Sequence, residues 1–234
     1  RWRQRVAEMD SAYDAQVAGA KQEHAKRVAD WETRRQHFLE EQDRRNSDID
    51  LLKREYEDRH PTAIKGYCEI VLTRSVYPDC LGERSFKLDY DPECHTVVVE
   101  YNLPKPDDVP RLKAVKYVQS RDGFEEVLLP EKARESLYDE VLYQMALRTA
   151  HELFEADYVQ VVEYVVFNGW VHFVDRSTGN TTNACILSLH VKREEFASIN
   201  LAEVDPKACF KQLKGVGSAK LHGLAPIAPI LQLD

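Results

Sequence analysis

The segment 205–222 combines glycine and lysine in a pattern that suits contact with phosphate. Gly215 and Gly217 flank a single residue, and glycines allow backbone N–H groups to turn toward an anion. Four lysines stand against one acid, Asp205, so this segment is basic in a chain of net charge −8. The residues predicted to contact nucleic acid are Lys207, Lys211, Lys214, Gly215, Gly217, Ser218 and Lys220.

This pattern resembles the hairpin of helix-hairpin-helix DNA-binding modules, with Asp205-Pro206 at the start of the first helix. The second helix of such a module would be short here, because Gly223 and Pro226 follow soon. The alternative interpretation is a helix C-cap and a turn whose lysines are solvated.

A metal-dependent nuclease core is the second chemistry to consider. It needs a carboxylate and then a strand bearing Glu-x-Lys, in which two acids hold the metal and the lysine assists the attacking water. Asp89 or Asp91 precedes a predicted strand that carries Glu100, but the lysine position is Asn102. This is at best a degenerate site, and an acid and an amide at a strand end are also ordinary structural features. We predict no catalytic residue in this chain.

Metal binding by cysteine or histidine is not predicted either. Cys80, Cys94 and His95 could be combined with Cys68, but none shows a paired Cys-x-x-Cys spacing. His172 and His190 lie on adjacent predicted strands and could face each other, although polar residues on the wet face of a sheet are the commoner explanation. The sequence contains no Walker loop and no dinucleotide-binding fingerprint. We therefore expect no cofactor and no metal.

The elements that must position these residues are clearest in residues 130–191. Pro130 and Glu131 open a helix whose apolar residues recur at helical spacing until about Ala156-Asp157. Residues 158–167, 170–174 and 184–191 are rich in β-branched and aromatic residues and read as strands. Asn168-Gly169 predicts a tight turn between the first two strands. We expect one long helix packed on an antiparallel meander.

Shorter elements are expected before and after this region. His60-Pro61 closes the first helix of the chain, and a second helix follows at about 62–76. Strands are predicted at 86–90, 96–101 and 114–119, with an extended loop at 103–110 and a polar connection from the third strand to the long helix. Short helices are predicted at 192–199 and from Asp205-Pro206, and the apolar tail 224–233 is either a strand or the lead into a further domain.

The first 60 residues form a helical arm in this interpretation. Residues 2–59 contain no proline and one glycine, and larger or apolar residues recur at intervals of three, four or seven. A continuous helix of this length cannot bury its apolar stripe on so small a domain, so a coiled coil or helical hairpin that mediates self-association is favoured over a solvated helix. The predicted oligomerisation residues are Val17, Trp31, Phe38 and Leu52.

Charge and composition limit the classes of function. Residues 1–60 hold 13 Lys/Arg and 14 Asp/Glu, which leaves 19 and 26 for residues 61–234. The second part is thus acidic, which counts against a surface that is basic all over. No run of 18 apolar residues exists, no signal peptide is visible, and five irregularly spaced cysteines fit a reducing cytoplasm. The chain lacks a starting Met, so we expect a fragment or a processed form.

Several segments together carry a family resemblance. They include residues 101–104, 112–118, 137–144, 146–157, 167–171, 183–188 and 205–210, among them Tyr101-Asn102-Leu103-Pro104 and Phe167-Asn168-Gly169-Trp170. Over about residues 62–234 the chain resembles the region ahead of the nuclease in large Mrr-like restriction endonucleases of bacteria. The resemblance implies that a PD-(D/E)xK nuclease domain, which uses Mg²⁺, follows downstream. None of that domain's catalytic residues has a position in this chain.

The combined expectation is an α+β protein with a helical arm at 1–60 and a regulatory or recognition domain at 61–234. Its expected role is assembly, sensing and DNA positioning in bacterial antiphage or foreign-DNA defence. The partners we expect are a second copy bound through the arm, with duplex DNA and a phage-derived trigger as candidates, and no membrane. The alternative is a protein-interaction adaptor that binds a phage or partner protein and does not touch nucleic acid. A third hypothesis is a small-molecule-sensing domain, in which the sheet and the long helix enclose a pocket, although no ligand signature is visible. We expect a cytoplasmic location.

Overall fold

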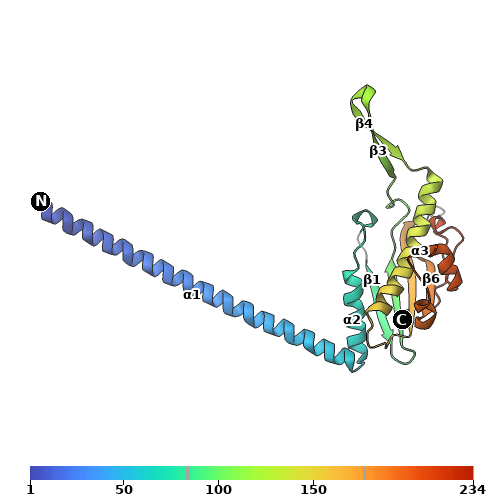
Figure 1. The fold of residues 1–234 in the computed structure, drawn as a ribbon, viewed down its shortest axis with the longest axis horizontal. Helices are drawn as coiled ribbons and strands as arrows, with labels where there is room; N and C mark the ends of the chain where they lie inside the picture. Colours follow the sequence, from blue (N-terminus) through green and yellow to red (C-terminus); the bar gives the residue numbers. More distant parts are fainter. Residues whose placement is uncertain (83–84, 176–177, 234) are drawn as a thin grey trace. The chain divides into compact units, whose positions relative to one another are not determined.

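The computed structural model describes residues 1–82, 85–175 and 178–233. The chain forms two compact units, residues 1–54 and 55–234, and the division lies within the first helix. The first unit is α-helix throughout from Trp2 onward and belongs to α1, Trp2–Glu57 (Figure 1). The long helix expected from the lack of proline is therefore confirmed.

The second unit is a mixed α and β domain. Its helices are α2 (Pro61–Arg74), α3 (Glu131–Ala156), α4 (Arg193–Ala197) and α5 (Pro206–Gln212). Pro61, Glu131 and Pro206 begin three of them, as expected for residues that suit the first helical turn. Within the described residues, no helix combines the length and the apolar character that a bilayer span requires.

The main sheet has five strands in the order β1-β2-β5-β6-β7. The strands are β1 (Phe86–Asp91), β2 (Thr96–Asn102), β5 (Tyr164–Val174), β6 (Thr181–Lys192) and β7 (Val216–Gly217). β2 pairs with β5 in parallel, whereas the other pairs are antiparallel. The prediction of an antiparallel sheet is therefore correct for β5 with β6 but wrong for β2 with β5, because the crossover through α3 returns the chain parallel to β2.

Asn168-Gly169 does not form the predicted turn. It lies inside β5, and the pairing with β6 shifts by one residue between Gly169 and Trp170. The Asn168 side chain is buried, where it accepts a hydrogen bond from Ser188 Oγ at 2.7 Å and donates to the Leu231 carbonyl at 2.6 Å. A Cβ on Gly169 would lie 2.3 Å from Leu103, so this glycine admits the Leu103 side chain. Residues 158–163, also predicted as strand, precede β5 without regular structure.

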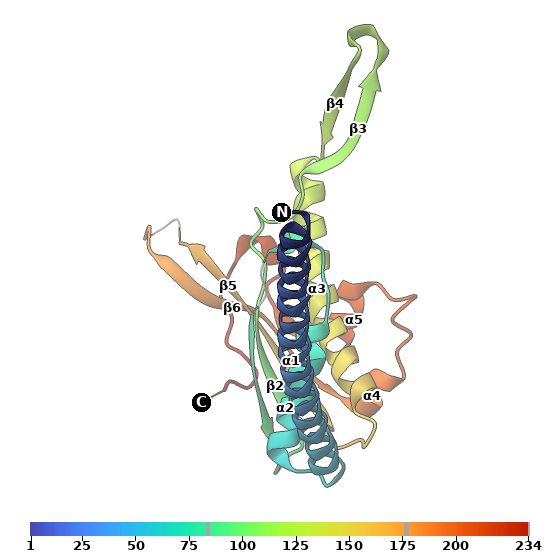
Figure 2. The same ribbon diagram turned by 90° about the vertical axis from the view of Figure 1, so that its left-hand side faces the viewer.

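A strand was missed between the third predicted strand and the long helix. β3 (Leu112–Val118) pairs antiparallel with β4 (Gly123–Leu128), and the two form a sheet of their own. Figures 1 and 2 show this hairpin projecting from the domain beside the start of α3.

The core of the domain lies between α3 and the main sheet (Figure 2). Helical side chains such as Tyr138, Leu142 and Met145 are almost fully buried, as are Val97 and Phe167 on the strands. The tail 224–233 is not a strand, but it is attached to the sheet. The Ile227 N–H donates to the Cys185 carbonyl at 2.8 Å, and the Ile230 N–H donates to Ser188 Oγ at 3.1 Å.

Candidate functional site

The predicted phosphate-binding segment begins with α5. The Asp205 carboxylate caps this helix by accepting the Ala208 N–H at 2.7 Å. Lys214, just after the end of the helix, adopts the left-handed region with φ 58°. The chain then forms β7 and a short 3₁₀ helix, Leu221–Gly223. The structure therefore has a strand and one 3₁₀ turn where a helix-hairpin-helix module has its second helix.

The backbone of this turn is engaged within the domain. The Lys214 and Gly215 N–H groups donate to the carbonyls of Lys211 and Phe210, each at 2.9 Å. A Cβ on Gly215 would lie 2.4 Å from the Phe210 ring, and Phe210 is buried. Gly217 pairs with Leu187 in the sheet. The two glycines thus have packing and pairing roles, and this geometry does not form an open cradle of free N–H groups.

The four predicted lysines remain on the surface. Lys211, Lys214 and Lys220 are exposed and Lys207 is half-buried, and in the described part of the chain none of them forms an ion pair. Ser218 Oγ donates to the Lys220 carbonyl at 2.7 Å, so its hydroxyl stabilises the local turn. What remains of the predicted site is a set of solvent-facing ammonium groups on one short segment.

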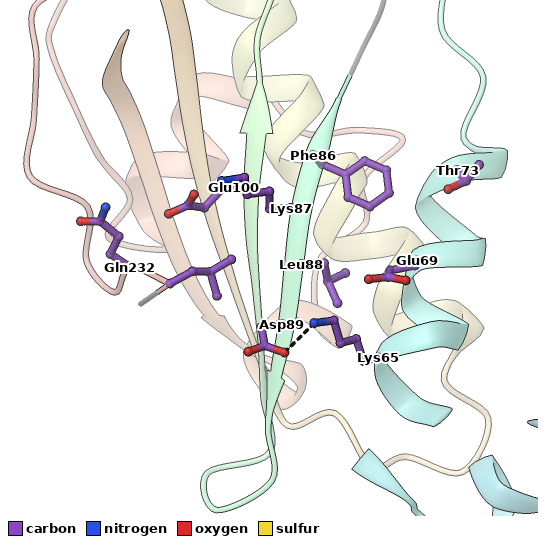
Figure 3. Close-up of a pocket in the computed structure, with 10 residues that line it drawn as sticks. Lys65, Glu69, Thr73, Phe86, Lys87, Leu88, Asp89, Glu100 and Gln232 are labelled. Atoms are coloured by element: carbon purple, nitrogen blue, oxygen red, sulfur yellow. Dashed lines mark ion pairs between the residues drawn. The ribbon is translucent and has the colours of Figure 1, made fainter. Parts of the chain in front are cut away.

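The carboxylates of the degenerate nuclease pattern have structural partners. Asp89 forms an ion pair with Lys65, which Figure 3 marks with a dashed line. The distance from Asp89 Oδ1 to Lys65 Nζ is 3.1 Å. Asp91 accepts hydrogen bonds from the Glu93 N–H and from Cys94 Sγ. These bonds hold the pKa of Asp91 below its usual range. Asn102, at the lysine position, donates to Ser85 Oγ at 2.6 Å.

A groove of about 770 Å³ follows β1, which is the edge strand of the main sheet (Figure 3). One face of α2 lines this groove through Lys65, Glu69 and Thr73, which are four residues apart. Residues 86–89 of β1 line the other side. A second hollow of about 580 Å³ shares Glu100 and Lys87 with it. The residues that line the first groove are Lys65, Glu69, Thr73, Phe86, Lys87, Leu88, Asp89, Glu100, Gln232 and Leu233.

Two polar atoms near these hollows stand out. Glu100 Oε1 and Trp170 Nε1 are shielded from solvent and have no hydrogen-bond partner among the described residues. Glu100 lines both hollows, and Trp170 lines the second. Since a buried polar group without a partner costs free energy, a bound group that donates to Glu100 or accepts from Trp170 would be favoured here.

The backbone of β1 offers further hydrogen-bonding groups. The Asn102 N–H donates to the Ser85 carbonyl at 2.9 Å, and hydrogen-bonded pairs alternate along an antiparallel ladder. In this register Lys87 and Asp89 bond toward β2. The N–H and C=O groups of Phe86, Leu88 and Tyr90 therefore point toward the open edge. An edge strand beside a helix is the arrangement to which an extended peptide can add as a further strand.

The predicted oligomerisation residues all lie on α1. Trp31 and Phe38 are 56% and 57% exposed, and Val17 and Leu52 are half-buried in the single chain. Their spacings are multiples of seven, which places them on one slowly drifting stripe of the helix.

The cysteine and histidine pairings weighed from the sequence do not come together. All five cysteines are free thiols, and within the described ranges no group of three or more potential ligands is placed to hold a metal ion. His172 pairs in register with Asn183 and His190 with Val166, so the two histidines do not face each other.

Sequence reasoning missed a buried polar network around Asp157. This carboxylate is 3% exposed, accepts the Tyr56 hydroxyl at 2.6 Å and the Val162 N–H at 2.8 Å, and pairs with the Arg193 guanidinium. Burial, followed by the bond to Asp157, raises the pKa of Tyr56 well above its ordinary value. The signal available in the sequence was the position of Asp157, which directly follows a helix with an apolar face.

A second missed contact fixes the end of the lysine segment. The Asp139 carboxylate on α3 accepts the His222 N–H at 2.8 Å, and its Oδ1 lies 3.0 Å from His222 Nδ1. His222 Nε2 lies 3.7 Å from Glu135.

The chain matches no protein-family model, no curated protein and no solved structure.

Proposed function

We propose that this chain is a non-catalytic assembly and sensing region of an Mrr-like restriction endonuclease that acts in bacterial defence against phage and other foreign DNA. The link to restriction rests on the sequence segments that resemble that family. The proposed nuclease domain, with its Mg²⁺, belongs to a different part of the protein. The role of this chain is to pair subunits and to recognise a trigger or hold DNA.

The arm carries the assembly part of the proposal. The heptad-spaced stripe exposes Trp31 and Phe38, large apolar side chains that a second helix would cover. Because the arm is helical over its full described length, a partner helix could contact the whole stripe.

Contact with DNA is supported by the exposed lysines of the segment 205–222. Their ammonium groups are solvent-facing, so each could neutralise a backbone phosphate. Because the turn's own N–H groups are engaged, the expected contact is electrostatic and independent of base sequence.

The groove along β1 favours a second candidate function, a protein-interaction adaptor. Its open backbone edge, the apolar Phe86 and the charged Glu69 and Lys87 suit an extended peptide segment of a phage or partner protein. The acidic balance of residues 61–234 is also compatible with this function.

Duplex-DNA binding, measured by fluorescence anisotropy at low and near-physiological salt, distinguishes a DNA-positioning role from a protein-interaction adaptor. The full chain is compared with a Lys211→Glu/Lys214→Glu/Lys220→Glu variant. The matched control is Lys26→Glu/Lys105→Glu/Lys132→Glu, which changes the net charge equally at exposed sites elsewhere. We expect the chain to bind duplex DNA with an affinity that falls as the salt concentration rises. The first variant should lose at least tenfold more affinity than the control variant does.

Equal loss in both variants would make the binding a nonspecific charge effect. Absence of binding at low salt would remove DNA positioning from the proposal and favour the adaptor.

A further inference from the structure

The second hollow, of about 580 Å³, gathers polar side chains from several strands of the main sheet. Glu100 and Asn102 lie two residues apart on β2, so they project from one face of that strand. Trp170 and His172 have the same spacing on β5, and Trp170 pairs in register with Asn102. Asn183 on β6 pairs with His172. The register of three strands therefore brings these five side chains to one hollow.

Two opposite charges lie side by side at this hollow. Lys87 on β1 pairs in register with Glu100 on β2, and both line the hollow. Figure 3 shows their side chains on the side of these strands that faces away from α2. Among the residues that the structure describes, neither of the two takes part in an ion pair. Each charge is therefore available to a bound group of the opposite sign.

The wall of the hollow also carries polar atoms without partners. Glu100 Oε1 and Trp170 Nε1 are shielded from solvent and have no hydrogen-bond partner in the described part of the chain. A buried polar atom without a partner costs free energy, so a purely structural role does not account for Glu100. Rotation about the last side-chain torsion of Glu100 exchanges its two oxygens, so either can meet a donor in the hollow.

The two charges select the class of ligand. An anion bound to Lys87 would lie beside the Glu100 carboxylate, and a cation bound to Glu100 would lie beside the Lys87 ammonium group, so each would meet repulsion. A zwitterion satisfies both groups at once. An α-amino acid carries its ammonium and carboxylate groups on one carbon atom, which suits two charges on neighbouring strands. The rest of the lining includes Asn102, His172 and Asn183, and these favour a polar side chain on the ligand.

We propose that this hollow binds a free α-amino acid with a polar side chain, whose ammonium group pairs with Glu100 and whose carboxylate pairs with Lys87. The indole of Trp170 forms part of the wall beside it. The inference goes beyond the proposed function, because it involves neither the arm nor the lysines of the segment 205–222.

Isothermal titration calorimetry of the full chain with each common L-α-amino acid tests the ligand class. We expect at least one amino acid with a polar side chain to bind saturably at one site per chain. Its N-acetyl and its amide derivatives each lack one of the two charges and should bind at least tenfold more weakly. Derivatives that bind as tightly as the free amino acid would overturn the zwitterion and indicate a peptide as the ligand.

Glu100→Gln and Lys87→Met test the two charged groups. Each variant should bind the best amino acid at least tenfold more weakly than the parent. The matched controls Glu69→Gln and Lys132→Met remove the same charges at exposed positions outside this hollow and should bind like the parent. Glu100→Gln should also be at least as resistant to urea as the parent, because it removes a charge that has no partner in the free chain.

Tryptophan fluorescence locates the bound amino acid. Trp2→Phe/Trp31→Phe leaves Trp170 as the single tryptophan, and its emission should shift with the same Kd that calorimetry gives. An unchanged emission would place the ligand elsewhere and overturn the assignment of this hollow. Absence of binding by every amino acid would overturn the proposal, as would binding that Glu100→Gln and Lys87→Met leave unaffected. None of these outcomes depends on DNA binding or on the arm, so failure here is distinct from failure of the proposed function.

Discussion

Asp157 shows how one residue can connect several elements. It caps the end of α3, and its partners come from the last turn of α1 and from the start of α4. Arg193 also donates to the carbonyls of Val162 and Phe154, at 2.8 and 2.9 Å. The carboxylate is therefore the common acceptor for groups that are distant in sequence.

Replacing Asp157 with Asn should lower the free energy of unfolding by about 3 kcal/mol, because one partner of a buried charge pair is lost. The amide NH₂ must also face either the Tyr56 hydroxyl or the Val162 and Arg193 donors. Urea denaturation of the full chain measures the change.

Asp107→Asn is the matched control. The Asp107 side chain is 74% exposed, although it pairs with Arg111 and Arg134. A loss of no more than about 1 kcal/mol is expected for an exposed pair. If both variants lost the same amount, the network around Asp157 would not be a major source of stability.

Gly215 and Gly217 illustrate a different lesson at the residue scale. A side chain is hard to accommodate at Gly215, whereas a Cβ on Gly217 would lie at least 3.4 Å from its neighbours, and the sequence pattern does not say what approaches either glycine. At Gly215 the neighbour is the buried Phe210 ring, and at Gly217 it is the strand β6.

At the scale of elements, β5 shows tertiary context prevailing over a local turn signal. Asn-Gly favours a two-residue hairpin, yet here Asn168 bonds to Ser188 and Leu231, and Gly169 makes room for Leu103. A strand paired on both sides gains more hydrogen bonds from continuing than a turn would provide.

The arm α1 carries the element-scale prediction. The double variant Trp31→Asp/Phe38→Asp should weaken self-association of the full chain at least tenfold, because two large apolar side chains, each contributing about 1.5–3 kcal/mol on burial, are lost from the stripe. Analytical ultracentrifugation gives the mass distribution.

Thr33→Asp/Gln36→Asp adds the same charge about half a turn away on the helix and should leave the mass distribution unchanged. An arm that tolerates both double variants equally would be a solvated helix and not a coiled coil.

At the scale of the whole molecule, burial of ionisable groups predicts an alkaline limit to stability. Burial raises the pKa of Tyr90 to about 12, and it also raises the pKa values of Tyr56 and Tyr138. The folded protein therefore keeps these phenol protons, whereas the unfolded chain releases them near pH ~10. The thiol of Cys68, whose pKa burial raises to about 12, acts in the same direction from a lower pH.

The free energy of unfolding should accordingly fall as pH rises through about 10 to 12, by up to ~1.4 kcal/mol per pH unit for each such group. Urea midpoints at pH ~9 and pH ~11 measure this slope. Tyr90→Phe should make the slope smaller. A slope that is unchanged in this variant would mean that Tyr90 titrates alike in both states.

Much of the secondary structure could be predicted from local sequence. The absence of proline determined α1, the periodicity of residues 131–156 determined α3, and Asp205-Pro206 determined the start of α5. The α+β class follows from these elements. These features depend on interactions a few residues apart, which a sequence displays directly.

The tertiary structure alone decided the features that join distant residues. It determined the parallel pairing of β2 with β5, the partners of Asn168 and Asp157, and the groove between α2 and β1. It also separated β3 and β4 from the main sheet, which leaves Phe124 exposed. Strand order and burial depend on which segments meet after the chain crosses over, and no local pattern of residue types records that choice.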